Sequence, residues 1–352
     1  MMSDVDQRPR ILITRLSAIG DCILTLPVVC ALRQHFPQAH IVWAIEPAGA
    51  KLLNGHRAVN EWMIVPKGWL KSPRMIREYR RQLRAQQFDW ALDPQSLTKS
   101  SMLAWLSGAK NRVGFSRPDG REIAPRLNTI LVDRDMPHIV DASLGLLRPL
   151  GIDRPSVRFD VPFSRGAETT IDAFVRNTHL NGGYAVINVG ASCPAKQWPT
   201  GRIGRVARHL GERHNLPSVL TWCGQEERAL AEHALTKAGG HAFMAPDTTL
   251  AELAALLQRG RIAVASDTGP LHLAVAVGTP CVGLHSITRA EKSGAYGAQN
   301  SAVEAGSPRI RNRRRRQKDD TAIRKIMVDS VCHACDEVLL RLSMTVPLQR
   351  AA

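Results

Sequence analysis

Aromatic side chains are scarce in this chain, where Phe, Trp and Tyr make up 5% of the 352 residues. Proteins that bind single-stranded nucleic acid stack the bases on aromatic rings, so the scarcity argues against such a surface. The sequence also has no run of about 20 apolar residues, the length that crosses a bilayer as a helix. Because residues 1–10 lack the apolar segment of a signal peptide, we expect a cytoplasmic protein with reduced thiols.

Common phosphate-binding and metal-binding motifs are missing as well. No G-x-G-x-x-G follows the first predicted strand and no G-x-x-x-x-G-K-[ST] occurs, which argues against nicotinamide-dependent oxidoreductases and P-loop NTPases. The seven Cys are scattered except for Cys332 and Cys335, and no second pair follows to complete a zinc site. We therefore expect no metal site and no cofactor.

Acidic residues are few beside basic ones, 31 against 47, which gives a formal net charge of +16. Such an excess favours an anionic partner: nucleic acid, an anionic membrane surface or a phosphorylated substrate. A basic surface without any partner is the plainer interpretation. The run from Arg311 to Arg316 leaves the same choice open, between a solvated loop and a patch that contacts membrane or substrate.

The order of predicted elements indicates an α/β protein with two domains, as the length also suggests. In the first part we predict strands at 10–15, 41–45, 62–65 and 90–93, with helices at 22–35 and 73–87. The second part repeats the pattern with strands at 184–189, 219–223, 241–245, 261–266 and 281–284. We place the boundary within 160–178 and expect domains at 1–170 and 171–325. A C-terminal helix within 326–352 is expected to pack back on the first domain.

Residues that follow predicted strands are the candidate site residues, because ligands of parallel sheets bind at the carboxyl ends of the strands. Asp21 follows the first strand after Gly20, and it is either a helix N-cap or a carboxylate that accepts a proton. In the second domain, Asp267-Thr268-Gly269-Pro270 opens a helix whose free N–H groups suit a phosphate, with His272 nearby. Lys196 and Glu226 or Glu227 follow two further strands, where they suit a diphosphate and a ribose.

Four segments together resemble glycosyltransferase family nine, the heptosyltransferases of lipopolysaccharide inner-core synthesis. They are Arg15-Leu-Ser-Ala-Ile-Gly-Asp-Cys-Ile-Leu-Thr-Leu-Pro27, Phe88–Ser100, Asn188–Pro199 and Ser266–Pro280. The first is closest to heptosyltransferase I-like members, and Ser96 departs from the more usual Gly. The resemblance implies a GT-B fold, two Rossmann-like domains with parallel sheets facing a central cleft.

The resemblance also implies roles for single residues. Asp21 matches the general base. The donor contacts are Ser192, Lys196, Asp267, Thr268, Gly269, His272 and either Glu226 or Glu227. Arg121 matches an acceptor-side arginine, and we expect Gly20, Lys67, Lys71 and Arg74 to meet the acceptor as well.

The function expected from this resemblance is an inverting, metal-independent transfer of heptose from ADP-heptose to Kdo–lipid A or a related glycan. The expected partners are thus a nucleotide-sugar donor and an anionic glycolipid, with a peripheral position on the inner face of the cytoplasmic membrane as a further expectation. Another nucleotide sugar or acceptor within the family is the first alternative. A nucleic-acid-binding protein, suggested by charge, and an oxidoreductase, suggested by fold alone, are more distant.

Overall fold

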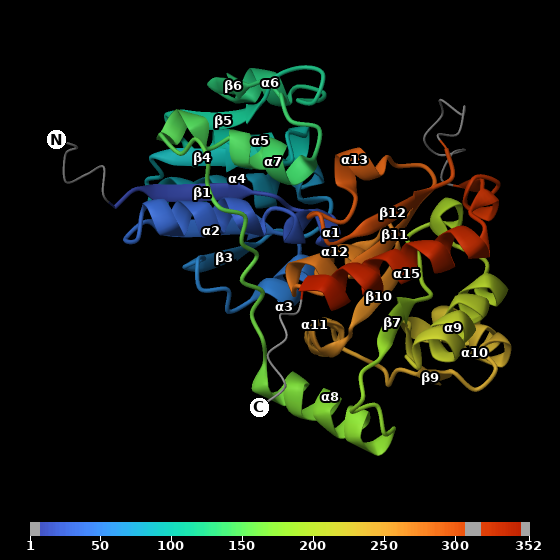
Figure 1. The fold of residues 1–352 in the computed structure, drawn as a ribbon. Helices are drawn as coiled ribbons and strands as arrows, with labels where there is room; N and C mark the ends of the chain where they lie inside the picture. The colour runs from blue at the N-terminus through green and yellow to red at the C-terminus, as the bar shows by residue number, and fades with distance from the viewer. Residues whose placement is uncertain (1–7, 307–317, 346–352) are drawn as a thin grey trace. The chain divides into compact units, whose positions relative to one another are not determined.

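The computed structural model describes residues 8–306 and 318–345. The chain divides into two compact units, residues 1–162 and 163–352 (Figure 1). The division falls within the boundary region predicted at 160–178 and before the domain end predicted at 170, because helix α8 (Arg165–Asn177) packs on α11 (Leu250–Arg259) of the second unit. The run Arg311–Arg316 lies outside the described residues.

A six-stranded parallel sheet in the order β3-β2-β1-β4-β5-β6 forms the first unit. Its strands are β1 (Arg10–Thr14), β2 (His40–Ile45), β3 (Glu61–Ile64), β4 (Trp90–Asp93), β5 (Asn111–Phe115) and β6 (Ile130–Val132). Its α-helices are α1 (Ile19–Ile23), α2 (Leu26–His35), α3 (Pro47–Leu53), α4 (Pro73–Ala85), α5 (Thr98–Ser107), α6 (Ala124–Leu127) and α7 (Ile139–Gly145). The strand order reverses between β1 and β4, so the loops after these two strands diverge and leave room for a ligand.

The helix predicted over 22–35 is two helices, α1 and α2. Pro27 stands at the second position of α2, where its missing N–H is harmless. The same proline could not lie within one continuous helix without removing a hydrogen bond and clashing with the preceding turn. The break sets α1 apart as a short helix of five residues at the carboxyl end of β1, and that helix carries Asp21.

The second unit repeats the architecture with the order β12-β11-β10-β7-β8-β9. Its strands are β7 (Ala185–Asn188), β8 (Ser218–Thr221), β9 (Ala242–Met244), β10 (Ile262–Ser266), β11 (Cys281–His285) and β12 (Ser301–Glu304). Besides α8 and α11, its α-helices include α9 (Thr200–His214), α10 (Gly224–Lys237), α12 (Gly269–Ala276), α13 (Ala290–Ser293) and α15 (Val328–Thr345). The prediction of two Rossmann-like domains is confirmed, and here the order reverses between β7 and β10.

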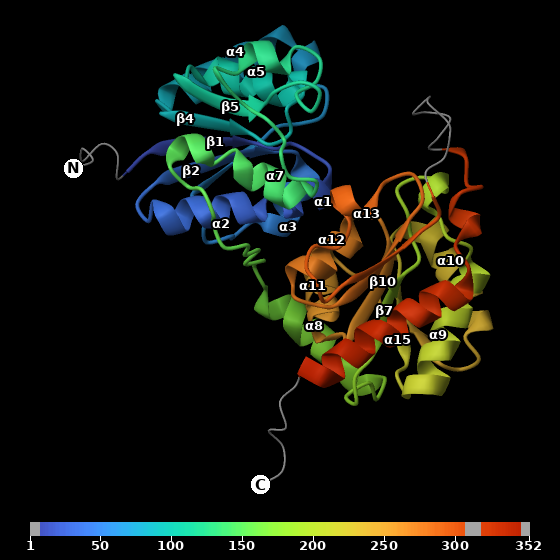
Figure 2. The ribbon, with the colours of Figure 1, turned by 45° about the horizontal axis from the view of Figure 1, so that its top comes forward.

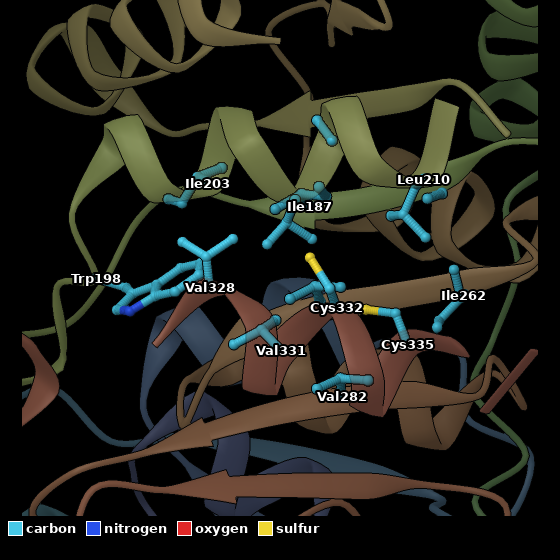
Figure 3. Packing of buried hydrophobic residues seen from close by; sticks show 14 of the residues in the cluster. Ile187, Trp198, Ile203, Leu210, Ile262, Val282, Val328, Val331, Cys332 and Cys335 are labelled. Atoms are coloured by element: carbon cyan, nitrogen blue, oxygen red, sulfur yellow. The ribbon is translucent and has the colours of Figure 1, made fainter. Parts of the chain in front are cut away.

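The C-terminal helix α15 packs on the second unit, not on the first as we expected. It lies beside α9 in both ribbon views (Figures 1 and 2), and it also contacts β11 and β12. Its buried side chains Val328, Val331, Cys332 and Cys335 fill the space between α9 and the sheet (Figure 3). Burial of this apolar face determines where the helix docks. The two cysteines are core residues, with thiol pKa values raised by burial.

No helix in the described part of the chain is both long and apolar enough to cross a membrane.

Candidate functional site

Asp21 lies in α1, directly beyond the carboxyl end of β1. It is the third residue of that helix and not its N-cap, which is Ala18. The carboxylate accepts the backbone N–H of Ala18 at 3.3 Å and forms an ion pair with Arg15 at 2.9 Å, both through Oδ2. Among the described residues, no partner meets Oδ1, and the side chain is 44% exposed. One oxygen of Asp21 is therefore fixed and the other is available to a substrate hydroxyl.

Charged and polar side chains, which the sequence did not single out, connect the loops near Asp21. Arg15 is buried and donates to the carbonyl of Pro94 at 2.8 Å, and this hydrogen bond holds its guanidinium in place beside Asp21. Lys99, on α5, donates to Ser17 Oγ at 2.7 Å and forms an ion pair with Glu46 at 2.9 Å. These contacts tie together the loops after β1, β2 and β4, which are neighbours in the sheet.

The predicted acceptor residues fall on two sides of Asp21. Lys67, Lys71 and Arg74 are exposed on the segment after β3, while Arg121 is exposed on the loop after β5. Each of these strands is two positions from β1, one on either side, so at about 4.8 Å per strand the strands themselves lie roughly 10 Å from β1. The two groups therefore follow strands on opposite sides of the strand that precedes Asp21. Gly20 is buried beside Asp21 in α1.

Lys196 and Asp267 form the central contact of the second unit. The ammonium of Lys196 donates to the carboxylate Oδ2 and to the backbone carbonyl of Asp267, both at 2.7 Å. They meet because β7 and β10, the strands that precede them, are adjacent. An ammonium has three donors, so one remains for a ligand. The sequence did not anticipate this direct contact between Lys196 and Asp267.

The ionisation of Asp267 is secured by its neighbours. Its other oxygen, Oδ1, lies 3.3 Å from Nε2 of His272, and Oδ2 also accepts the hydroxyl of Thr288 at 2.6 Å. Burial would raise the pKa of Asp267, but the hydrogen bond from His272 and the charge of Lys196 outweigh it and hold that pKa well below its ordinary value. Thr288 follows β11, and no motif pointed to it.

The amino end of α12 is open to a ligand. Thr268 is the N-cap, but its hydroxyl donates to the carbonyl of Ser266 at 3.0 Å and does not cap the helix. Within the residues that the structure describes, the N–H groups of Thr268 and Gly269 meet no acceptor, and Pro270 has no N–H. Unsatisfied N–H groups at the positive end of a helix dipole attract an anion such as a phosphate.

The structure distinguishes Glu226 from Glu227, which the sequence left open. Glu227 reaches back over the loop after β7: a Cβ added at Gly190 would lie 2.1 Å from its carboxylate. Its Oε2 also accepts the N–H of Cys223 at 2.9 Å. Burial raises the pKa of Glu227, an effect that this N–H bond opposes. Glu226 is exposed, and so is Ser192 in the loop before Lys196.

A buried histidine also lies near this site. His285 ends β11, is 1% exposed, and neither of its ring nitrogens finds a partner in the described part of the chain. Burial lowers its pKa, while the charge of Asp267 opposes that shift. A buried imidazole near the Lys196–Asp267 pair was not predicted, because its position depends on the neighbouring strand and loop.

Comparison with known proteins identifies relatives over most of the chain. The model of the family described as glycosyltransferase family 9 (heptosyltransferase) matches residues 76–322. Lipopolysaccharide heptosyltransferase 1 of Salmonella typhimurium is 28% identical over 305 residues, which cover 83% of this chain and 93% of that protein.

Solved structures confirm the predicted GT-B fold. A family 9 glycosyltransferase from Veillonella parvula superposes with a TM-score of 0.82 at 23% identity, covering 97% of this chain and 99% of that one. The E. coli heptosyltransferase WaaC with ADP-2-deoxy-2-fluoro heptose gives a TM-score of 0.72 at 22% identity, covering 93% and 99%.

Proposed function

The chain belongs to glycosyltransferase family 9 and is a glycosyltransferase, and from that premise we propose that it moves a heptose from ADP-heptose to a lipopolysaccharide inner-core acceptor. The observation that carries the proposal is the meeting of Lys196, the open amino end of α12 and Glu227 at the carboxyl ends of neighbouring strands. A cation and free N–H groups suit a diphosphate, and a carboxylate suits ribose hydroxyls. The Salmonella relative, a heptosyltransferase, supports heptose as the transferred sugar, and the ADP-2-deoxy-2-fluoro heptose bound to WaaC supports ADP as the nucleotide.

The proposed reaction is a single displacement with inversion at the anomeric carbon. Asp21 accepts the proton of the acceptor hydroxyl while that oxygen forms a bond to the anomeric carbon. The bond from this carbon to the donor phosphate breaks, and ADP leaves with the electron pair. Lys196 and the N–H groups of Thr268 and Gly269 stabilise the negative charge that develops on the diphosphate. Asp267 positions Lys196 for this task.

We propose that the transfer needs no divalent metal, since protein groups meet the leaving charge. Lys67, Lys71, Arg74 and Arg121 are proposed to meet an anionic acceptor such as Kdo–lipid A. Their exposed positions on both sides of Asp21 suit an acceptor with several negative charges. Because such an acceptor is a glycolipid, we propose that the protein takes a peripheral position on the inner face of the cytoplasmic membrane. The family membership gives the nucleic-acid and oxidoreductase alternatives no support.

The test is ADP release from ADP-heptose with Kdo–lipid A as acceptor, measured as an initial rate with and without EDTA. We expect ADP release that depends on the acceptor and is unchanged by EDTA. A panel of other nucleotide sugars tests the donor. If no ADP is released from ADP-heptose but nucleotide is released from another nucleotide sugar, the donor sugar is not heptose. Loss of the initial rate in EDTA, at a temperature at which the chain stays folded in EDTA, would overturn metal independence.

A matched pair of variants tests the ribose contact. Glu227→Gln should weaken ADP binding about 10-fold or more, because hydrogen bonds to a charged group contribute about 1.5–3 kcal/mol. Glu226→Gln is the control: it removes the same charge from the same turn of α10, but the side chain is exposed. Isothermal titration with ADP measures both affinities. Equal affinities in the two variants, or a larger loss in Glu226→Gln, would show that Glu227 does not bind the nucleotide.

A further inference from the structure

Two histidines and an aspartate from different helices converge outside the donor site. His209 and His214 lie on the last two turns of α9, and Asp336 lies on α15, which runs beside α9 (Figure 2). The Nε2 atoms of His209 and His214 stand 2.8 Å and 2.6 Å from the same carboxylate oxygen, Oδ1 of Asp336. Each of the three residues offers one ligand atom, and these three atoms all lie within 4.8 Å of one another, close enough to hold one metal ion.

The donor set matches a known kind of metal site. Two imidazole nitrogens and one carboxylate oxygen are ligands of Zn²⁺ and its first-row neighbours, whereas Mg²⁺ and Ca²⁺ prefer oxygen alone. At metal–ligand distances of about 2.0–2.2 Å, tetrahedral ligand atoms lie roughly 3.3 Å apart. Each imidazole Nε2 lies 2.8 Å or 2.6 Å from Oδ1 of Asp336, and all three ligand atoms lie within 4.8 Å of one another, so small side-chain rotations that lengthen the two N–O distances by about half an ångström make room for an ion. Each neutral imidazole would carry its proton on Nδ1 and coordinate through Nε2.

The surroundings of the cluster orient its ligand atoms and leave them accessible to solvent. Arg213 contacts the second oxygen, Oδ2 of Asp336, at 3.2 Å, which fixes the carboxylate and directs Oδ1 to the two histidines. The three side chains are about a quarter exposed, at 26%, 26% and 24%. A cavity of about 500 Å³, lined in part by His214, Asp336 and His333, gives access from solvent and space for a water ligand. The carboxyl end of α9 places the negative end of a helix dipole there.

We propose that His209, His214 and Asp336 bind a divalent cation of the Zn²⁺ class that ties the C-terminal helix α15 to α9. The site is structural. Helix α9 begins after the loop that follows β7 and ends before β8, so its last turn lies at the amino ends of these parallel strands. Lys196 and Asp267 lie at the carboxyl ends. The ion would thus be at the opposite end of the sheet from the proposed donor site, and the inference is independent of the proposed function.

The test uses the full chain, without a histidine tag, after removal of metal with EDTA and dialysis. Addition of Zn²⁺ in about 100-fold excess over its dissociation constant should raise the Tm by about 5 °C or more, and Mg²⁺ should not. Titration should give about one ion per chain at this site. Co²⁺ should give a visible absorption band typical of nitrogen and oxygen ligands, without the thiolate charge-transfer band that binding at a cysteine would produce.

His214→Gln and Asp336→Asn should each abolish the Zn²⁺-dependent rise in Tm. The matched control is His333→Gln. His333 lies on α15, like Asp336, and lines the same cavity, but it is outside the cluster, so this variant should keep the Zn²⁺-dependent rise in Tm. Failure of the wild-type chain to take up Zn²⁺ or Co²⁺ at micromolar concentration would overturn the proposal and leave a hydrogen-bonded contact between helices. The same rise in Tm in His214→Gln as in the wild type would also overturn it, even if a variant is less stable at the outset.

Discussion

Asp21→Asn is expected to lower kcat by about 10²–10⁴-fold, the usual contribution of a positioned general base. Asparagine keeps the shape of the side chain and can still accept the N–H of Ala18, but its amide cannot take the proton of the acceptor hydroxyl. ADP affinity should remain unchanged, because the proposed donor contacts belong to the second unit. ADP release under saturating donor and acceptor measures kcat, and titration with ADP measures the affinity.

The control for Asp21→Asn is Asp89→Asn. Asp89 precedes β4 at the amino ends of the strands, where it accepts the N–H of Arg10 at 2.8 Å, a bond that asparagine can keep. We expect full activity in this variant. The Asp21 side chain is 44% exposed, so loss of its ion pair with Arg15 should lower the free energy of unfolding by at most about 1 kcal/mol. A kcat within threefold of the wild type in a folded Asp21→Asn variant would exclude Asp21 as the base.

Lys196→Gln is expected to lower kcat by about 10²–10³-fold, the typical effect of removing one donor that stabilises transition-state charge. The variant should also be less stable, by about 3 kcal/mol, because Asp267 stays buried and ionised without its counter-charge. Initial rates at a temperature well below the Tm separate the two effects. Thermal unfolding of the same samples then measures the loss of stability.

Lys237→Gln is the control for Lys196→Gln, since it removes an exposed positive charge from the end of α10. Both its kcat and its Tm should stay close to the wild type. A normal kcat in Lys196→Gln, combined with a lower Tm, would reduce Lys196 to the structural partner of Asp267. The ion pair by itself is consistent with either role, so the rate measurement decides.

Local sequence patterns predicted most of this architecture. Branched apolar runs such as 41–45 and 281–284 predicted strands that the structure contains as β2 and β11. The helix predicted at 73–87 is α4, which ends two residues earlier, at Ala85. Strand β6 was missed because it has only three residues, and β5 and β12 were missed because their apolar pattern is weak; β12 alternates between half-buried and exposed residues. The split of the first helix at Pro27 was missed because the apolar pattern continues across the break.

The sequence by itself determined which residues follow each strand, and hence the candidates Asp21, Lys196 and Asp267, because strand ends are local features. Only the tertiary structure decided which of them meet. The adjacency of β7 and β10 brings Lys196 onto Asp267, and the adjacency of β7 and β8 brings Glu227 over Gly190. Strand order and helix docking arise from burial of apolar faces between segments far apart in the chain, and no local pattern records those pairings. For that reason, the contact of His209 and His214 with Asp336 became visible only once α15 was seen to pack on α9.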